Sequence, residues 1–423
     1  MPEAMTRTRW WILTLLFFIT TNNYLDRIIL GFLAPAMQKE VGFNDQEYGY
    51  ITAAFQIAYA LGFLAFGKFI DARGARLGYA VAIVWWSFAA AGHALARNAW
   101  HLGFWRATLG LGESGNFPAA IKAVAEWFPK KDRAFATGIF NAGTNVATMI
   151  GPQLFAWLYM HFGWQTCFLL TASTGTLCFL FWWFYYRLPS EHRSVNSAEL
   201  AYIQSDPEEA QQASIGWMEA MSHKQAWAFA MAKFFTDPVW WFYLNWLTLY
   251  FVKERGLKLT EAAWALPVIY LMADFGSVFG GWFSGFLMKR GWPVARARKW
   301  TMALCALCMP IAASAVFAPN VVVATLLICF ATAGHQGWSA NLYTTTSDVF
   351  PKAAVASVTG IGGFAGGIGG FLFSSLLAGY IVQHFGYVPI FVIMGTFHLI
   401  AFGLLHFMMG DLAPISDRPA AKA

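Results

Sequence analysis

The stretch EWFPKKDRAFATGI, residues 126–139, returns as DVFPKAAVASVTGI at residues 348–361, an offset of 222 positions. The similarity continues to HFGW at 161–164 and HFGY at 384–387. An internal repeat of half the chain length is typical of membrane transporters built from two related bundles that rock about a site between them. Because a channel or a membrane enzyme does not need this repeat, the pattern favours a transporter.

The composition around the repeat is that of a bilayer protein. Hydrophobic residues make up 58% of the 423 positions and charged residues only 12%, about half the charged fraction of an average soluble domain. Mean hydropathy is +0.48. Apolar stretches long enough to cross about 30 Å of hydrocarbon recur along the chain. They predict an all-α membrane protein with twelve transmembrane helices, at about 10–35, 46–70, 75–96, 99–121, 133–158, 164–186, 226–252, 261–288, 298–318, 320–345, 353–382 and 386–410.

Charges in the loops give the orientation and the domain plan. Of the 28 Lys and Arg residues, 20 fall on the side that carries both termini, five on the other side and three inside spans. By the positive-inside rule the basic side, with both termini, is cytoplasmic. The polar stretch 187–225 has too few apolar residues for a core of its own. We therefore expect an N-terminal six-helix bundle at 1–186, a cytoplasmic linker at 187–225 and a C-terminal six-helix bundle at 226–423.

Several classes of site are not expected. The first span runs longer than the apolar region of a signal peptide and lacks a small-x-small exit, so it should stay in the mature protein. The five cysteines all fall within spans, which predicts neither a disulfide framework nor a metal site. Because the cytoplasmic loops account for most of the net charge of +6, that charge does not indicate nucleic acid. We expect no cofactor and a monomer.

Two predicted spans each carry an acid and a base. Asp26 and Arg27 lie in TNNYLDRIILGF at 21–32, and Arg106 and Glu113 lie in the fourth span. An ionised side chain in mid-membrane costs about 3 to over 10 kcal/mol, so each must face a cavity or a partner. Neighbours on a helix point about 100° apart, so Asp26 and Arg27 need partners on another helix. From their depths we expect Asp26 to pair with Arg106, which leaves Arg27 and Glu113 facing the central cavity.

These two acids and two bases are neutral when the site is empty. A substrate carboxylate on Arg27 makes the site one charge too negative in a low dielectric, and a proton on Asp26 or Glu113 restores the balance. Proton and anion binding then favour each other, which is the thermodynamic requirement for symport. The alternative is that the four charges only hold two helices together, although a single pair would be enough for that.

The segment GKFIDARGAR at 67–76 resembles the loop motif G-x-x-x-D-R/K-x-G-R/K-R/K of the major facilitator superfamily. Gly67, Asp71, Gly74 and Arg76 match it, whereas two alanines replace basic residues of the consensus. The resemblance implies that superfamily's fold of two pseudo-symmetric six-helix bundles.

The charged spans are similar to the anion:cation symporter branch of that superfamily, and within it to hexuronate transporters. The similarity is carried by NYLDR (23–27), RATLGLGESGNFPAAIKAVAEWFP (106–129), ATGIFNAGTNV (136–146), KFFTDPVWWFYLNWL (233–247) and GHQGWSANLYTTTSDVFP (334–351). It implies proton-coupled uptake of galacturonate or glucuronate through a bacterial inner membrane. By this resemblance Arg27 binds the carboxylate, Asp26 and Glu113 are proton sites, Arg106 is their partner, and Tyr59 touches the substrate.

Further polar residues can bind the hydroxyl groups of a sugar acid, since each hydroxyl needs a partner once water is removed. For each of them the alternative is hydrogen bonding or packing between helices. The candidates are Asn145 in the fifth span, Tyr243 and Asn245 in the seventh, and Gln336, Trp338 and Asn341 in the tenth.

Two ionisable residues and a glycine run have no assigned role. Asp274 is either a further proton-linked group or a partner for Lys233 or a helix end. His335 can titrate near neutral pH, but a lone histidine in a bundle is more often neutral and hydrogen-bonded. The run TGIGGFAGGIGGF at 359–371 has no strand beside it, so we interpret it as a packing and hinge segment and not as a nucleotide loop.

Other functions remain as alternatives. The first is proton symport of a different organic anion, such as an aldonate or an aromatic carboxylate. An efflux carrier is disfavoured because paired arginines suit anions better than the cations common in export. A membrane enzyme would need a nucleophile, a metal set or a cofactor loop, and the sequence offers no recognisable one. A transport-like sensor is the last alternative.

Overall fold

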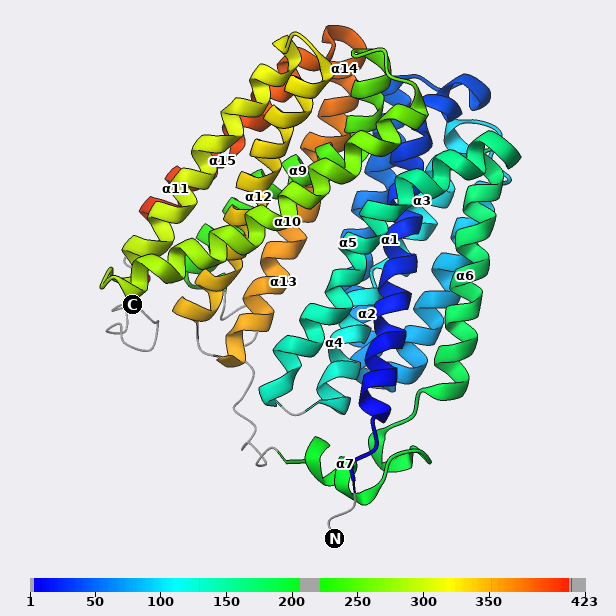
Figure 1. Cartoon of the computed structure of the whole chain (residues 1–423), viewed down its shortest axis with the longest axis vertical. Coiled ribbons are helices and arrows are strands. Elements are labelled where there is room, and N and C mark those ends of the chain that lie inside the picture. The colour runs from blue at the N-terminus through cyan, green and yellow to red at the C-terminus, as the bar shows by residue number, and fades with distance from the viewer. Residues whose placement is uncertain (1–3, 129, 206–220, 351, 411, 413–423) are drawn as a thin grey trace. The chain divides into compact units, whose positions relative to one another are not determined.

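The computed structural model describes residues 4–128, 130–205, 221–350, 352–410 and 412. Side chains are described except at 64, 68, 71, 125, 130–135, 137, 138, 347 and 352–357. Every regular element in these ranges is a helix, and seven stretches among them are long and apolar enough to span a membrane. The prediction of an all-α membrane protein is therefore confirmed (Figure 1).

The helices follow one another with short connections. The first half holds α1 (Thr8–Val41), α2 (Asp45–His93), α3 (Ala99–Glu113), α4 (Asn116–Trp127), α5 (Lys130–Phe162), α6 (Trp164–Tyr185), the 3-10 turn η1 (Pro189–Glu191) and α7 (Ser197–Ile203). The second half holds α9 (Lys224–Lys253), α10 (Leu259–Lys289), α11 (Val294–Ala313), η2 (Ser314–Phe317), α12 (Val321–Val349), α13 (Lys352–Gly369), the π-helical η3 (Gly370–Leu377), α14 (Ala378–Phe385) and α15 (Tyr387–Met409).

The chain forms two compact units. The first comprises Met1–Phe43 with Ala54–Ala210, and the second comprises Asn44–Ala53 with Gln211–Ala423. In the first unit α1 packs between α5 and α6 (Figure 1). In the second unit α10 packs on α12, and α9 packs on α13 and α15. The first turns of α2 belong to the second unit, where Asp45 forms an ion pair of 2.6 Å with Lys253.

The predicted second and third spans form the two parts of α2, which join at a kink. At Gly74 the backbone leaves the helical region, with φ 81° and ψ 163°. A residue with a side chain is strained in this conformation, so the glycine of the loop motif is required where the chain turns from one span into the next. The Asp71 side chain of that motif lies outside the described side chains.

The two halves repeat their helix boundaries as well as their sequence. Asn98 and Asn320, 222 positions apart, cap α3 and α12, and each side chain accepts a hydrogen bond of 2.9 Å from an amide three residues on. Gly163 and Gly386, the glycines of the HFG segments, both have positive φ and separate consecutive helices. The repeat therefore records a duplicated helical plan.

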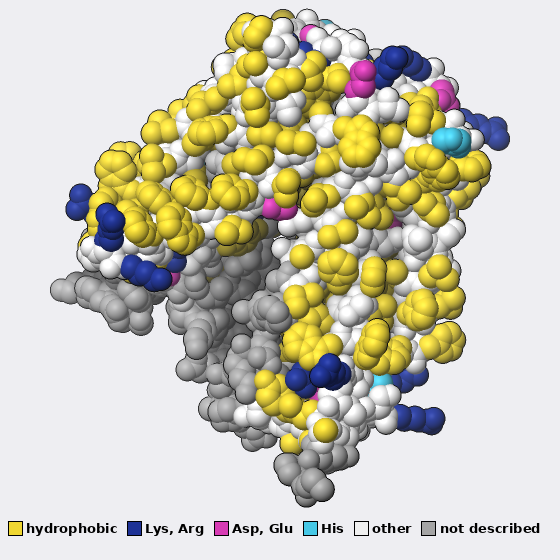
Figure 2. All heavy atoms as spheres, viewed as in Figure 1, with side chains coloured by type: hydrophobic (Ala, Val, Ile, Leu, Met, Phe, Trp, Pro, Cys, Tyr) yellow, Lys and Arg dark blue, Asp and Glu magenta, His cyan; other side chains and the backbone are white. Residues whose placement is uncertain are grey.

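The exposed surface has the character expected next to lipid. Large apolar side chains on α10 are exposed, among them Trp264 at 72%, Phe275 at 63% and Val278 at 74%. Figure 2 shows hydrophobic side chains over the middle of the helices, whereas Lys and Arg gather near helix ends. Apolar exposure on this scale is unusual for a water-soluble monomer and ordinary in a bilayer.

We predict that Gly74→Ala destabilises the protein by about 1–3 kcal/mol, because alanine must adopt a backbone conformation that is nearly restricted to glycine. Gly67→Ala is the matched control, since Gly67 lies on the same helix in open space without a positive φ. Thermal unfolding of both purified variants measures the difference. Equal melting temperatures would show that the turn at Gly74 is not strained by a side chain.

Candidate functional site

Arg27 of α1 and Glu113 of α3 form a buried ion pair in the first unit. Arg27 Nε donates to Glu113 Oε2 at 2.9 Å, and Arg27 Nη2 lies 2.9 Å from the same oxygen. The two side chains are 4% and 0% exposed. Glu113 Oε1 has no hydrogen-bond partner among the described residues. One half of this carboxylate therefore lacks the compensation that a buried charge needs.

Three aromatic rings surround the Arg27 guanidinium. Its Cζ atom lies 4.5 Å from the ring centroid of Tyr59, 4.8 Å from that of Tyr24 and 5.5 Å from that of Phe55. A desolvated cation–π contact contributes about 2 kcal/mol. Since aromatic faces attract a cation without neutralising it, these rings can keep the guanidinium in place while its anionic partner changes.

Arg106 of α3 binds the main chain of α1. Its Nη1 and Nη2 atoms donate to the carbonyl oxygens of Asp26 and Arg27, at 3.2 and 2.8 Å. Its guanidinium also lies 4.8 Å from the centroid of Phe55, and the residue is 2% exposed. Arg106 thus joins α3 to α1 at the adjacent charged residues Asp26 and Arg27.

Asp26 faces α6. Its Oδ2 atom accepts a hydrogen bond of 3.1 Å from Asn22 Nδ2, and Asn22 Oδ1 accepts one from Thr174 of α6. Asp26 is 1% exposed, and its Oδ1 atom has no hydrogen-bond partner among the described residues. Two buried carboxylates, Asp26 and Glu113, therefore each keep one uncompensated oxygen.

Close packing of α3 against α2 positions these groups. A Cβ atom at Gly110 would lie 2.5 Å from the carbonyl oxygen of Phe55, so only glycine permits this approach. Directly after Glu113 the helix is interrupted, and α4 begins at Asn116. Pro118 has no N–H for the carbonyl of Ser114, which accounts for a break at this point.

The observed pairing differs from the expected one. We expected Asp26 to pair with Arg106 and Arg27 and Glu113 to face the central cavity, but the structure joins Arg27 to Glu113 and bonds Arg106 to the main chain of Asp26. The physical reason is direction: adjacent residues on α1 point about 100° apart, so Asp26 turns to α6 while Arg27 turns to α2 and α3. Depth along a helix does not determine which neighbouring helix each side chain faces. The rings of Tyr24 and Phe55 were not among the predicted site residues, because they occupy ordinary apolar positions in the sequence.

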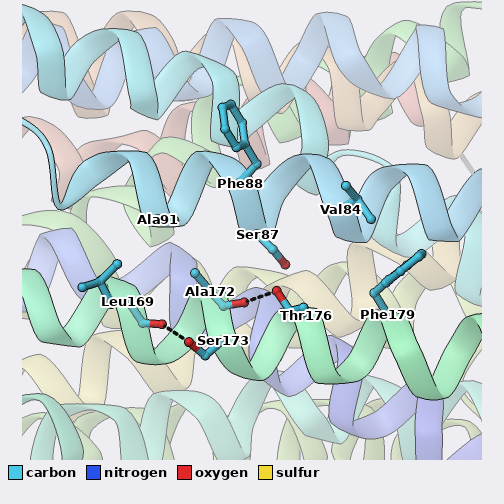
Figure 3. Close-up of a pocket in the computed structure, with 9 residues that line it drawn as sticks. All are labelled: Val84, Ser87, Phe88, Ala91, Leu169, Ala172, Ser173, Thr176 and Phe179. Atoms are coloured by element: carbon cyan, nitrogen blue, oxygen red, sulfur yellow. Dashed lines mark hydrogen bonds between the residues drawn. The ribbon is translucent and has the colours of Figure 1, made fainter.

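A groove of about 470 Å³ opens elsewhere in the same unit, between α2 and α6 (Figure 3). Ser87 points from α2 toward α6, where Gly175 leaves room for its hydroxyl. Ser173 and Thr176 donate to carbonyls of their own helix. The described lining is uncharged and is formed by Val84, Ser87, Phe88, Ala91, Leu169, Ala172, Ser173, Thr176 and Phe179.

The other predicted ligands of sugar hydroxyls have varied surroundings. Asn145 of α5 is partly exposed, and its amide oxygen accepts from Thr144 at 3.1 Å. In the second unit Gln336 is partly exposed, while Tyr243 and Asn245 are 1% and 7% exposed. Their role in binding stays a prediction.

Two of the predicted ligands on α12 are engaged in helix packing. Trp338 is fully buried, and its ring meets that of His398 edge-on at 5.5 Å. Asn341 donates to the carbonyl oxygens of Gly280 and Gly337, at 3.0 and 2.9 Å. These contacts connect α12 to α10 and α15, which is the alternative that the sequence left open.

The second unit also pairs Lys233 with a residue that the sequence analysis overlooked. Lys233 Nζ lies 2.7 Å from Asp237 Oδ2 on the same helix, so Asp274 is not its ion-pair partner in this structure. The spacing of four residues in KFFTD was the available signal. His335 stands at the repeat position of Glu113, 222 positions on, and its Nδ1 lies 3.1 Å from His398 Nε2.

The model of the Major Facilitator Superfamily matches residues 16–374. The chain belongs to this superfamily. It is therefore a multi-pass membrane transporter and not an enzyme.

Curated relatives of this transporter align over most of its length. It is 30% identical to the hexuronate transporter of Escherichia coli K12 over 399 residues, which cover 93% of this chain and 92% of the relative. It is 31% identical to the galacturonate transporter of Dickeya chrysanthemi over 285 residues, which cover 66% of this chain and 83% of the relative.

A solved structure shares the fold of this superfamily member. It is a bacterial homologue of the human lysosomal transporter Spinster, in an inward-facing and unoccupied conformation. The TM-score is 0.77 at 19% identity, with 99% of this chain and 100% of that chain covered.

We predict that Arg106→Met destabilises the transporter by about 3 kcal/mol or more, because hydrogen bonds of about 1.5–3 kcal/mol each are lost from two buried carbonyls. Arg97→Met is the control, since Arg97 is exposed in the connection between α2 and α3. The measurement is thermal unfolding of the two purified variants. A melting temperature of Arg106→Met equal to that of Arg97→Met would refute the structural role of Arg106.

Proposed function

We propose that this transporter is a proton-coupled symporter that imports a sugar-acid anion, with a hexuronate such as galacturonate or glucuronate as the first substrate to test. The observation that carries the proposal is the Arg27–Glu113 pair: a guanidinium that is caged by aromatic rings and neutralised by a single, half-satisfied carboxylate. The names of the relatives from E. coli and D. chrysanthemi support the substrate class.

Binding begins with an exchange of anions on Arg27. A substrate carboxylate presents the same two oxygens as Glu113 and can form a bidentate pair with the guanidinium. The displaced Glu113 is then a buried anion without a partner, a state that costs several kcal/mol. A proton on Glu113 removes that cost. Substrate and proton therefore each strengthen the binding of the other.

Asp26 provides a place for a second proton. Its carboxylate is held by an amide on one side only, so its charge too is poorly compensated. Moving one negative charge inward against the membrane potential costs about 2.3 kcal/mol per 100 mV, and one proton cancels this term. A second proton, on Asp26, makes uptake follow the potential as well as the pH gradient.

The remaining roles follow from this scheme. Tyr59 holds Arg27 and contacts the substrate, Arg106 keeps the α1 main chain in place, and Asn145 and Gln336 bind sugar hydroxyls. The two units alternate in giving access to each side of a bacterial inner membrane. Both termini face the cytoplasm, as the loop charges indicate.

We predict that Glu113→Gln separates binding from coupling. Glutamine cannot carry the proton, so the variant should lose accumulation driven by a pH gradient in proteoliposomes, yet keep exchange of labelled for unlabelled galacturonate. Arg27→Gln should lose both activities, with an affinity loss of about 2 kcal/mol or more, roughly 30-fold, because the site then keeps an unpaired carboxylate.

Glu40→Gln is the matched control, since Glu40 is an exposed acid on α1. It should behave like the unaltered protein in both assays. Full proton-driven accumulation by Glu113→Gln would contradict the coupling role. A panel with aldonates, aldarates and aromatic carboxylates in the same vesicles identifies the preferred anion, and uptake of an aromatic acid alone would contradict the sugar-acid assignment.

A further inference from the structure

A second buried ion pair lies in the second unit, on α9. Lys233 Nζ is 2.7 Å from Asp237 Oδ2 and donates to the hydroxyl of Tyr343 on α12 at 2.7 Å. The lysine side chain is 6% exposed, whereas that of Asp237 is 20% exposed. The acid is therefore more accessible at the molecular surface than the base.

The Lys233–Asp237 ion pair is expected to add little to the stability of the fold. Burying two charges costs more than burying apolar side chains of similar size. The lysine also precedes the acid by four residues, which is the less favourable order along a helix. A pair that adds little stability and occupies a membrane helix of a transporter is a candidate for a functional site.

Its neighbour α13 is shaped around the carboxylate. A Cβ atom at Gly366 would lie 2.0 Å from Asp237 Oδ2, so any side chain there displaces the acid. Gly363, in the same glycine run, has no atom within 4 Å of the corresponding position. Within the glycine run predicted as a packing and hinge segment, Gly366 therefore leaves the space that the Asp237 carboxylate fills.

We propose that Lys233 and Asp237 form a binding site for a carboxylate group, and that this site becomes available when Asp237 is protonated. While Asp237 is ionised, its carboxylate pairs with Lys233 and competes with any other anion. When Asp237 takes a proton from water, the lysine keeps its charge but loses its counter-ion, and an incoming carboxylate can replace it. The O–H of the protonated Asp237 can donate to the same anion. One proton is bound for each carboxylate bound, so this site alone couples the two.

The surroundings favour retention of the lysine charge. Tyr343 supplies a hydroxyl, and its ring centroid lies 4.4 Å from Lys233 Nζ. Both interactions persist when Asp237 is neutral. Titratable groups on the described helices packed against α9 include His335 on α12, His398 on α15, and Tyr270 and Asp274 on α10.

The identity of the anion rests on the proposed function, while the proton-linked chemistry of the pair does not. Purified full-length protein should bind galacturonate and galactarate more tightly on the acidic side of neutrality than on the alkaline side, as measured by titration calorimetry. Asp237→Asn leaves Lys233 without a competing charge at every pH. This variant should therefore bind more tightly than the unaltered protein at alkaline pH, by about 5- to 150-fold, the usual range of coupling between two linked sites. Lys233→Gln should bind the anion weakly at both acidic and alkaline pH.

Two glycine variants test the proposal independently. Gly366→Ala pushes the carboxylate from Lys233 and should shift alkaline affinity in the same direction as Asp237→Asn, while Gly363→Ala should leave it unchanged. If Gly366→Ala does not fold, Asp237→Asn adds no volume and decides alone. The proposal is overturned if Asp237→Asn keeps the affinity and pH dependence of the unaltered protein, or if Lys233→Gln binds normally at both pH values.

Glu113→Gln, measured in parallel, separates the two proposals. If the pH dependence of binding changes only in Glu113→Gln, the Arg27–Glu113 site is supported and the Lys233–Asp237 site is overturned. If it changes only in Asp237→Asn, the Lys233–Asp237 site is supported and the Arg27–Glu113 site is overturned. The unaltered protein could bind another carboxylate but no sugar acid. If Asp237→Asn then still increases the affinity for that carboxylate, the proposal for Lys233–Asp237 is supported and the hexuronate assignment is contradicted. A protein that binds no carboxylate at all overturns both.

Discussion

The positive charge of Arg27 is held inside a membrane helix by one carboxylate and three aromatic rings. An unpaired charge at such a depth would be too costly to keep, so the position of α3 relative to α1 and α2 is constrained by the need to bring Glu113 to it. Close packing at Gly110 and the bonds from Arg106 to the α1 main chain meet that constraint. The same constraint creates the chemistry, because an ion pair with one half-satisfied partner can be opened by a competing anion.

The two units place ionisable groups in different ways. In the first unit the pair joins two helices, and its acid lies where the chain breaks between α3 and α4. In the second unit the repeat position of Glu113 is His335, and the pair Lys233–Asp237 lies within α9. The duplicated helical plan therefore has not kept the same charges. Each unit instead has a buried ion pair in an arrangement of its own.

Much of the fold was predictable because it depends on strong local signals. Apolar stretches of membrane length, the central polar stretch and the repeat each follow from residue order alone, and so do charges inside predicted spans, among them Asp26, Arg27, Arg106, Glu113 and Lys233. The kink at Gly74 lies between the predicted second and third spans, at the glycine of the loop motif.

The pairing within the site was harder to predict than its members. Which charge faces which depends on helix rotation, and sequence fixes rotation only through packing details such as the contact of Gly110 with Phe55. Asp237 was missed because the sequence analysis sought a partner for Lys233 on another helix, and one turn along α9 was sufficient. Trp338 and Asn341 have the chemistry of sugar ligands, but burial and backbone contacts decide their present use.

The proposed coupling requires that an anion binds Arg27 in place of Glu113 and that Glu113 is then protonated. Infrared difference spectroscopy of the purified transporter, with and without galacturonate, observes this step through the carbonyl stretch of a protonated carboxylic acid. Binding should produce such a band, and Glu113→Gln should abolish it. A difference spectrum in which galacturonate binds but no carboxylic acid band appears, or in which the band persists unchanged in Glu113→Gln, would contradict the proposed coupling.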